Sequence, residues 1–152
     1  MAQFTRQELE DAFAQYQEDA RQACASGDWV TWANHFTSDA VYIEHFYGRM
    51  VGREAIASWI SETMGTFPGN AMPAFPVEWH VVDAERGWIV CELQNRMEDP
   101  GDGSVHQASN LTVLHYAGDG LWSYQEDVYN PAELAEMLKA WMKRRDELAA
   151  RG

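Results

Sequence analysis

Apolar positions change their spacing along the chain. In the first part they recur at intervals of three and four residues, which is typical of amphipathic helices. A capping signature at Thr5 begins the first predicted helix, and Gly27 ends it. Asp28 begins a second, shorter helix, and Gly52 precedes a third.

A period of two follows a Gly- and Pro-rich segment at residues 65–76. This alternation predicts four strands joined by short turns, and short connections require antiparallel pairing. An earlier strand pattern begins at Ala40 and turns near Gly48. A last helix begins at Asn130, followed by Pro131. The four later strands are expected at residues 77–82, 88–97, 105–116 and 121–129.

Three helices followed by a curled antiparallel sheet and a C-terminal helix predict an α+β fold. The chain has 152 residues, which suits one domain, and no repeat or linker divides residues 1–152. A chain of this length buries roughly 70% of its unfolded surface, so it needs no disulfide or metal to fold. The strands are apolar on both faces in places, so we expect a second copy of the chain to cover the outer face of the sheet.

Charge and hydropathy exclude several classes of binding partner and bear on where the protein is located. Eleven basic residues against 24 acidic ones give a net charge of −13, which repels nucleic acid and anionic lipid. No apolar run approaches 18 residues and the N-terminus is polar, so no membrane span or signal peptide is expected. The interpretation is a cytoplasmic protein whose two cysteines, Cys24 and Cys91, stay reduced.

Motifs for metals and cofactors are missing from the sequence. The five histidines form neither HxH nor HExxH, and two isolated cysteines make no zinc motif. The acidic segment at residues 98–103 lacks the spacing of a calcium loop and is interpreted as a turn. We therefore expect any catalysis to need no cofactor.

Three stretches carry a family resemblance. They read GDWVTWANHFTSDAVYIEH at residues 27–45, YGRMVGREAIASWI at 47–60, and VYNP at the end of the four-strand meander. This pattern resembles the nuclear transport factor 2-like superfamily, in its SnoaL-like branch of polyketide cyclase and ketosteroid isomerase relatives. The resemblance implies a cone of N-terminal helices packed on a curved sheet, an apolar pocket, and a homodimer. It implies a steroid, polyketide or terpenoid ligand, but this fold hosts several enzyme classes and non-catalytic binders.

The segment YIEH at residues 42–45 is the first candidate for chemistry. The resemblance to ketosteroid isomerases places the proton-shuttling carboxylate on Glu44. A Glu in an apolar cone loses hydration, so its pKa rises toward the range of a useful acid or base. A period of two places Tyr42 beside Glu44 on one face and His45 on the other, unless a bulge intervenes. Alternatively, Glu44 pairs with an Arg or a backbone amide at the pocket rim.

The oxyanion hole of ketosteroid isomerases is not matched. That family uses a Tyr on the first helix and a protonated Asp on a late strand. Here the Tyr position falls on Ala20, with Tyr16 one turn earlier, and the Asp position falls on Thr112. Steroid isomerisation by that mechanism is therefore not expected.

Two acidic residues on the last strand are candidates for a second carboxylate. Glu126 and Asp127 alternate, so they point to opposite faces, and SnoaL-like proteins often carry an acid at this end of the pocket. Two carboxylates in different environments form an acid/base pair able to drive dehydration, aldol closure or water attack on an epoxide. Alternatively, either residue forms a salt bridge at the dimer face or at a helix cap.

Asn110 is the remaining polar candidate of the meander. The alternation places it with Thr112 and His106 on one face, where it could orient a carbonyl or a water. Alternatively, it is a buried amide that the backbone satisfies.

The leading hypothesis is a dimeric enzyme that acts on an apolar oxygenated ligand by cofactor-free acid/base chemistry, as an isomerase, dehydratase, cyclase or epoxide hydrolase. One rival is a non-catalytic binding or accessory protein of the same fold; another is a protein whose sheet surface mediates assembly. The catalytic candidates are Glu44, Tyr42, Glu126 and Asp127, and the ligand-binding candidates are Tyr16, His45, Trp59, Asn110 and Thr112.

Overall fold

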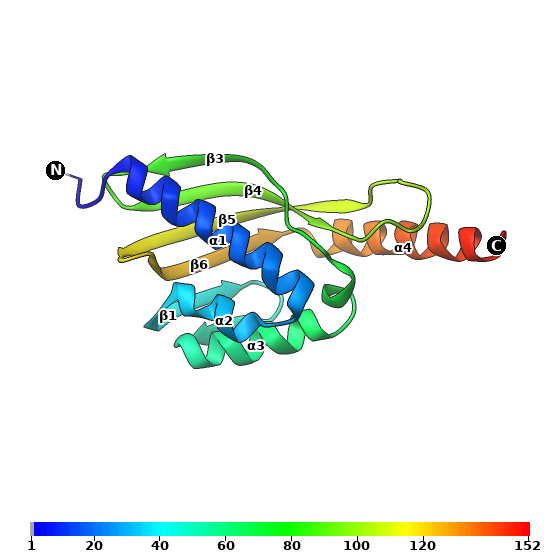
Figure 1. Ribbon diagram of the computed structural model, residues 1–152, viewed down its shortest axis with the longest axis horizontal. Helices are drawn as coiled ribbons and strands as arrows, with labels where there is room; N and C mark the ends of the chain where they lie inside the picture. The colour runs from blue at the N-terminus through cyan, green and yellow to red at the C-terminus, as the bar shows by residue number, and fades with distance from the viewer. Residues whose placement is uncertain (1) are drawn as a thin grey trace.

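A computed structural model describes residues 2–152 of the chain. The helices are α1 (Arg6–Ser26), α2 (Trp29–Trp32), α3 (Arg53–Gly65) and α4 (Pro131–Ala149). The strands are β1 (Phe36–Glu44), β2 (Gly48–Val51), β3 (Val77–Asp83), β4 (Trp88–Arg96), β5 (Gln107–Gly118) and β6 (Leu121–Tyr129). In Figure 1, α1 crosses one face of the sheet and α4 runs on beyond the ends of the strands. The predicted α+β fold is confirmed.

The six strands form one sheet in the order β2-β1-β6-β5-β4-β3. Strands β3 to β6 make the antiparallel meander that the short turns predict, and β2 pairs antiparallel with β1. In contrast, β1 pairs parallel with β6, which lies far away along the chain. The parallel register sets Tyr42 opposite Gln125 and Glu44 opposite Asp127.

Strand β1 begins earlier than its sequence pattern predicts. Its first residue is Phe36 rather than Ala40, because Phe36 is completely buried and pairs with Trp122 of β6. The register then shifts before Val41, and the exposed Asp39 lies in that irregular stretch. Because this stretch is polar and irregular, apolar and polar residues do not alternate at the start of the strand, and the sequence pattern does not reveal it.

Strand β5 begins later than predicted, at Gln107. His106 therefore precedes the strand, and its Nε2 lies 3.0 Å from the hydroxyl of Ser104. The predicted shared strand face of His106 with Asn110 and Thr112 is wrong, because the alternation of β5 does not extend back to residue 106.

The main core fills the space between α1, α2, α3 and the sheet. Its completely buried side chains include Leu9, Phe36, Ile56, Ile89, Leu114 and Trp122. Both cysteines are free. Within residues 2–152, no helix is long and apolar enough to cross a membrane.

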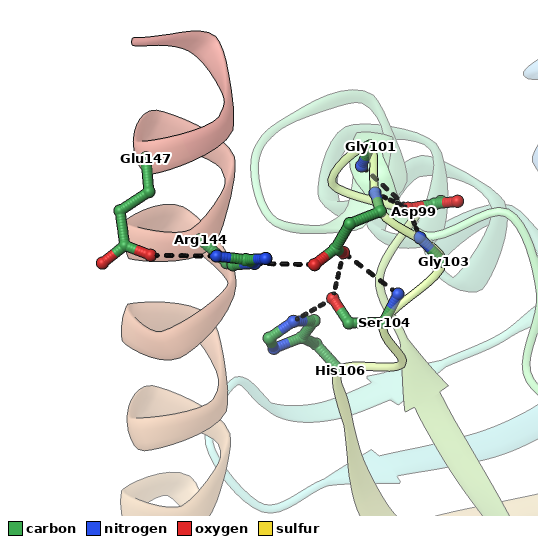
Figure 2. A network of polar contacts seen from close by, with 8 residues as sticks. Asp99, Gly101, Gly103, Ser104, His106, Arg144 and Glu147 are labelled. Carbon is green, nitrogen blue, oxygen red and sulfur yellow. Dashed lines mark hydrogen bonds and ion pairs between the residues drawn. The ribbon is translucent and has the colours of Figure 1, made fainter. Parts of the chain in front are cut away.

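Helix α4 is attached to the β4–β5 loop near its C-terminal end. The indole Nε1 of Trp141 donates to the carbonyl of Glu98 at 2.8 Å, and Arg144 Nε donates to Asp102 Oδ2 at 2.7 Å. Figure 2 shows Arg144 extending from the helix to this loop, with Glu147 on its other side. In a smaller core, Met137 and Trp141 of the helix pack with Ala71, Met72, Met97 and Ala108. These contacts hold α4 in place beyond the ends of the strands.

Replacing Trp141 with Phe tests this attachment. A smaller phenyl ring stays in the core, but the Glu98 carbonyl loses its donor, so the free energy of unfolding is expected to fall by about 1–3 kcal/mol. Urea denaturation measures the change. The same replacement at Trp88, which is 38% exposed, is expected to change stability by less than about 0.5 kcal/mol. Equal effects at the two positions would contradict the role of Trp141.

Candidate functional site

A cavity of about 840 Å³ lies between the inner face of the sheet, α1, α3 and the first turns of α4. This volume is typical of a site for a small organic ligand. Its aromatic lining consists of Phe13, Tyr16, Trp29, Trp32, Tyr42, Phe46, Tyr47, Trp59, Phe75 and Tyr129. The strands contribute the polar side chains Glu44, Asn95, Asn110, Gln125 and Asp127.

Asp127 is the centre of a buried hydrogen-bond network. The hydroxyl of Tyr42 donates to Asp127 Oδ2, and the hydroxyl of Thr112 donates to Oδ1 at 2.7 Å. The amide of Gln125 donates to Oδ1 at 3.1 Å and to the Tyr42 oxygen at 2.9 Å. Three donors from β1, β5 and β6 therefore fix the position of one carboxylate.

Tyr16 extends this network to helix α1. Its hydroxyl donates to Gln125 Oε1 at 2.7 Å, which orients the Gln125 amide toward Tyr42 and Asp127. The Tyr16 hydroxyl keeps free lone pairs, because its only proton is used in this bond. Helix and sheet are thus connected through polar groups at the floor of the cavity.

The environment of Asp127 makes its carboxyl a weaker acid than an exposed aspartic acid. Burial raises the pKa of Asp127, and the hydrogen bonds from Tyr42, Thr112 and Gln125 offset only part of that rise. Burial, followed by the charge of Asp127, raises the pKa of Tyr42 well above its ordinary value. A carboxyl with a raised pKa can exchange a proton closer to neutral pH than an exposed one.

Glu44 faces the same cavity but has different contacts. It is only 4% exposed, and its two oxygens accept the backbone N–H groups of Phe46 at 3.2 Å and Tyr47 at 2.8 Å. The Tyr42 hydroxyl, which we expected beside Glu44, donates to Asp127 instead. Glu44 therefore stabilises the β1–β2 turn by accepting its backbone N–H groups, which is the second of the two roles that the sequence allowed for this residue.

Glu126 and His45 lie on the outer face of the sheet. His45 Nε2 is 2.6 Å from Glu126 Oε2, and the hydroxyl of Tyr124 donates to Glu126 Oε1 at 2.6 Å. These contacts, the Tyr124 bond foremost, lower the pKa of Glu126. Neither Glu126 nor His45 lines the cavity. The two adjacent acids of β6 thus have pKa values shifted in opposite directions.

The other predicted ligand-binding residues lie at or just behind the cavity wall. Trp59 of α3 lines it, with its ring centroid 4.9 Å from that of Tyr42. Asn110 also lines it, and its amide donates to Thr112 Oγ1 at 2.9 Å. Thr112 is completely buried, does not line the cavity, and contacts it only through its hydrogen bonds with Asp127 and Asn110.

Gln125 was not among the sequence candidates, although it connects both tyrosines to Asp127. The signal was available, because the alternation that directs Asp127 inward does the same for Gln125. Within residues 2–152, no cluster of His, Cys, Asp and Glu could hold a metal ion.

The helices, the curved six-stranded sheet and the cavity between them define the nuclear transport factor 2-like class of α+β proteins. Residues 17–125 match the family model of the SnoaL-like domain, so the chain belongs to the SnoaL-like family. The comparison with curated proteins finds no match.

The solved structures that share the fold include the following three. An LEH-like epoxide hydrolase from M. tuberculosis has a TM-score of 0.68 and 14% identity, covering 94% of this chain and 93% of its own. SalBIII, an epoxide hydrolase/cyclase-like enzyme of pyran ring formation in polyether salinomycin, has a TM-score of 0.63 and 12% identity, covering 84% and 94%. An NTF2-like protein from Anabaena variabilis has a TM-score of 0.63 and 15% identity, covering 86% and 95%. Identities this low establish a common architecture.

The raised pKa of Asp127 predicts a pH-dependent stability difference between the wild type and Asp127→Asn. Above the ordinary Asp pKa of about 3.9, the unfolded chain releases this proton while the folded chain still holds it. The stability that the neutral carboxyl contributes is therefore lost as the pH rises, by up to about 1.4 kcal/mol per pH unit, until the folded pKa is passed. From pH 4 upward, the free energy of unfolding of the variant should therefore rise relative to that of the wild type, and the difference should then level off.

Urea denaturation of both proteins between pH 4 and pH 8 measures this difference. The pH at which the difference levels off gives the folded pKa of Asp127. A difference that stays constant, or that shrinks as the pH rises, would show that burial does not dominate at this carboxyl.

Proposed function

We propose that this protein is a cofactor-free enzyme that binds an apolar oxygenated molecule in the cavity and acts on it by general acid/base chemistry. The observation that carries the proposal is the Asp127 carboxyl, buried at the floor of the cavity and held by Tyr42, Thr112 and Gln125. The reaction classes that suit it are isomerisation, dehydration, cyclisation and epoxide hydrolysis. The epoxide hydrolase and cyclase relatives support this range.

The direction of the hydrogen bonds favours a hydroxyl or a water as the group that reacts first. The hydroxyl protons of Tyr42 and Tyr16 are donated to Asp127 and Gln125, so towards a ligand these two oxygens can act only as hydrogen-bond acceptors. An O–H group in the cavity can donate to ionised Asp127 and lose its proton to it. The oxygen then attacks an electrophilic carbon, and the displaced oxygen recovers the proton from Asp127.

Tyr42 and Gln125 act as positioning residues in this scheme. Gln125 can only donate through Nε2, so its bonds to Tyr42 and Asp127 keep the two oxygens in a fixed relation. Glu44 lies directly opposite Asp127 in the register and adds a second acidic side chain to the cavity. The carboxylate that accepts the proton is therefore held in one position.

Turnover of Asp127→Asn tests the assignment. The variant keeps the shape of the side chain but cannot carry the proton, so turnover is expected to fall by about 10²- to 10⁴-fold. The assay uses a panel of apolar epoxides and β-hydroxy ketones, with products identified by mass spectrometry. The matched variant is Glu126→Gln, which removes the neighbouring carboxylate on the outer face and is expected to retain activity within a few-fold. Equal rates for Asp127→Asn and the wild type would refute the role of Asp127.

A non-catalytic binding protein is the second candidate. The observation in its favour is that the donors at the floor are bonded to one another, and that the oxyanion-hole positions are Ala20 and Thr112. This candidate predicts that a bound ligand is recovered chemically unchanged. Any product formed at a rate that depends on Asp127 would contradict it.

We further propose that the protein forms a homodimer through the outer face of the sheet. Trp79, Leu111 and Val128 lie in one row across that face, with Glu92 between the first two. The exposed fractions of the three apolar side chains are 44%, 42% and 44%. An apolar patch of this kind is typical of a self-complementary interface.

Leu111→Lys places a charge at the middle of this row. The lysine lies directly opposite Glu92 within the sheet, so the monomer fold is expected to tolerate it. Sedimentation velocity at micromolar concentration is expected to show a dimer for the wild type and a monomer for the variant. Val30→Lys, on α2 away from the sheet, serves as the control and should remain dimeric. A monomeric wild type would refute both the dimer and the assembly function.

A further inference from the structure

Glu44 is a buried carboxylate without a cation beside it. Its side chain lines the cavity, its oxygens accept the two backbone N–H groups of the β1–β2 turn, and the Tyr129 hydroxyl lies beside it. None of the ion pairs among residues 2–152 includes Glu44. A buried carboxylate normally has a positively charged partner, because the loss of hydration is otherwise expensive.

Aromatic side chains line the same part of the cavity as this carboxylate, and two of them, Phe46 and Tyr47, are 68% and 54% exposed at its mouth. Tyr47 lies between Phe46 and Trp59, with centroid distances of 5.2 Å and 5.7 Å, and all three side chains line the cavity. Tyr129 also lines it, and burial together with the nearby charge of Glu44 raises the pKa of Tyr129. We call these four aromatic residues and Glu44 the Glu44 cage.

The charges that face the cavity are predominantly negative. Its acidic side chains are Glu18, Glu44 and Asp127, and Arg21 is the one basic residue of the described chain that lines it. Arg21 is already bonded to Glu18 through two hydrogen bonds of 2.9 Å and 2.6 Å. The net charge of −13 adds to the same field. The cavity therefore disfavours anionic ligands and attracts cations.

We propose that the Glu44 cage binds the positive charge of an amine-bearing ligand, namely a tertiary or quaternary ammonium group on an apolar body. The faces of aromatic rings attract a cation within about 6 Å of their centroids, most strongly when the site excludes water. The carboxylate of Glu44 supplies the opposite charge, and the backbone N–H groups of the turn hold it in position. The inference rests on the proposed function in one respect, that the ligand occupies this cavity, and it defines the class of that ligand.

The register explains how one ligand would contact both acids. Glu44 and Asp127 lie directly opposite each other on neighbouring strands, which are about 4.8 Å apart. An ammonium group in the Glu44 cage leaves Asp127 free to meet an oxygen only a few bonds away on the same molecule. An amino alcohol or an amine with an adjacent epoxide has this arrangement.

A pair of probes of equal shape separates charge from size. The charged probe is (3-hydroxyphenyl)trimethylammonium, and the neutral one is 3-tert-butylphenol. Isothermal titration calorimetry of the full chain is expected to show that the charged probe binds about tenfold or more tightly than the neutral one. In Glu44→Gln this ratio should fall to about two or less. Glu92→Gln removes the same charge from the outer face of the sheet and should keep the wild-type ratio.

Trp59→Leu provides a test that leaves the carboxylate and the β1–β2 turn intact. It should lower the ratio of the two affinities at least about threefold, because a π face is lost while apolar contact remains. Equal binding of both probes by the wild type, or an unchanged ratio in Glu44→Gln or Trp59→Leu, would overturn the proposal and leave the acid/base function of Asp127 standing. Failure of both probes to bind would count against the ligand cavity of the proposed function and against the cage together.

Discussion

The parallel pairing of β1 with β6 is the constraint on which the site depends. It joins the first and last strands of the chain, one strand in from the β2 edge of the sheet, and sets their inward-facing side chains in register. The Tyr42 hydroxyl reaches Asp127, and Glu44 lies opposite that same residue, only because this register holds. The helices then enclose the acids among aromatic side chains. The same pair of strands therefore joins β1 and β2 to the meander and positions the polar side chains of the cavity.

Much of the fold follows from local signals in the sequence. Caps at Thr5, Asp28 and Asn130 mark helix starts that the structure has, because each side chain accepts the backbone N–H groups that a helix leaves free. The meander follows from short turns, which permit only antiparallel neighbours. The parallel β1–β6 pair has no such signal, because it joins distant segments and no connection length restricts it. The early start of β1 at Phe36 was hidden by the irregular stretch around Asp39.

Alternation predicts which residues share a face but not which face is the inner one. It grouped Tyr42 with Glu44 and separated Glu126 from Asp127, and the structure has those groupings. The choice between the two acids of β6 needed the enclosure by α1 and α3, which is a property of tertiary packing. The same holds for the partner of Tyr42. Its neighbour along the strand is Glu44, but its hydrogen-bond acceptor comes from the adjacent strand.

The attachment of α4 has a consequence for acidic solutions. The hydrogen bonds of Ser104 and the guanidinium of Arg144 hold the pKa of Asp102 far below its usual range, whereas burial raises that of Asp127. When the pH falls, Asp127 therefore takes up its proton well before the Arg144–Asp102 contact breaks. A fall in pH therefore changes the charge inside the cavity before it releases α4 from the β4–β5 loop.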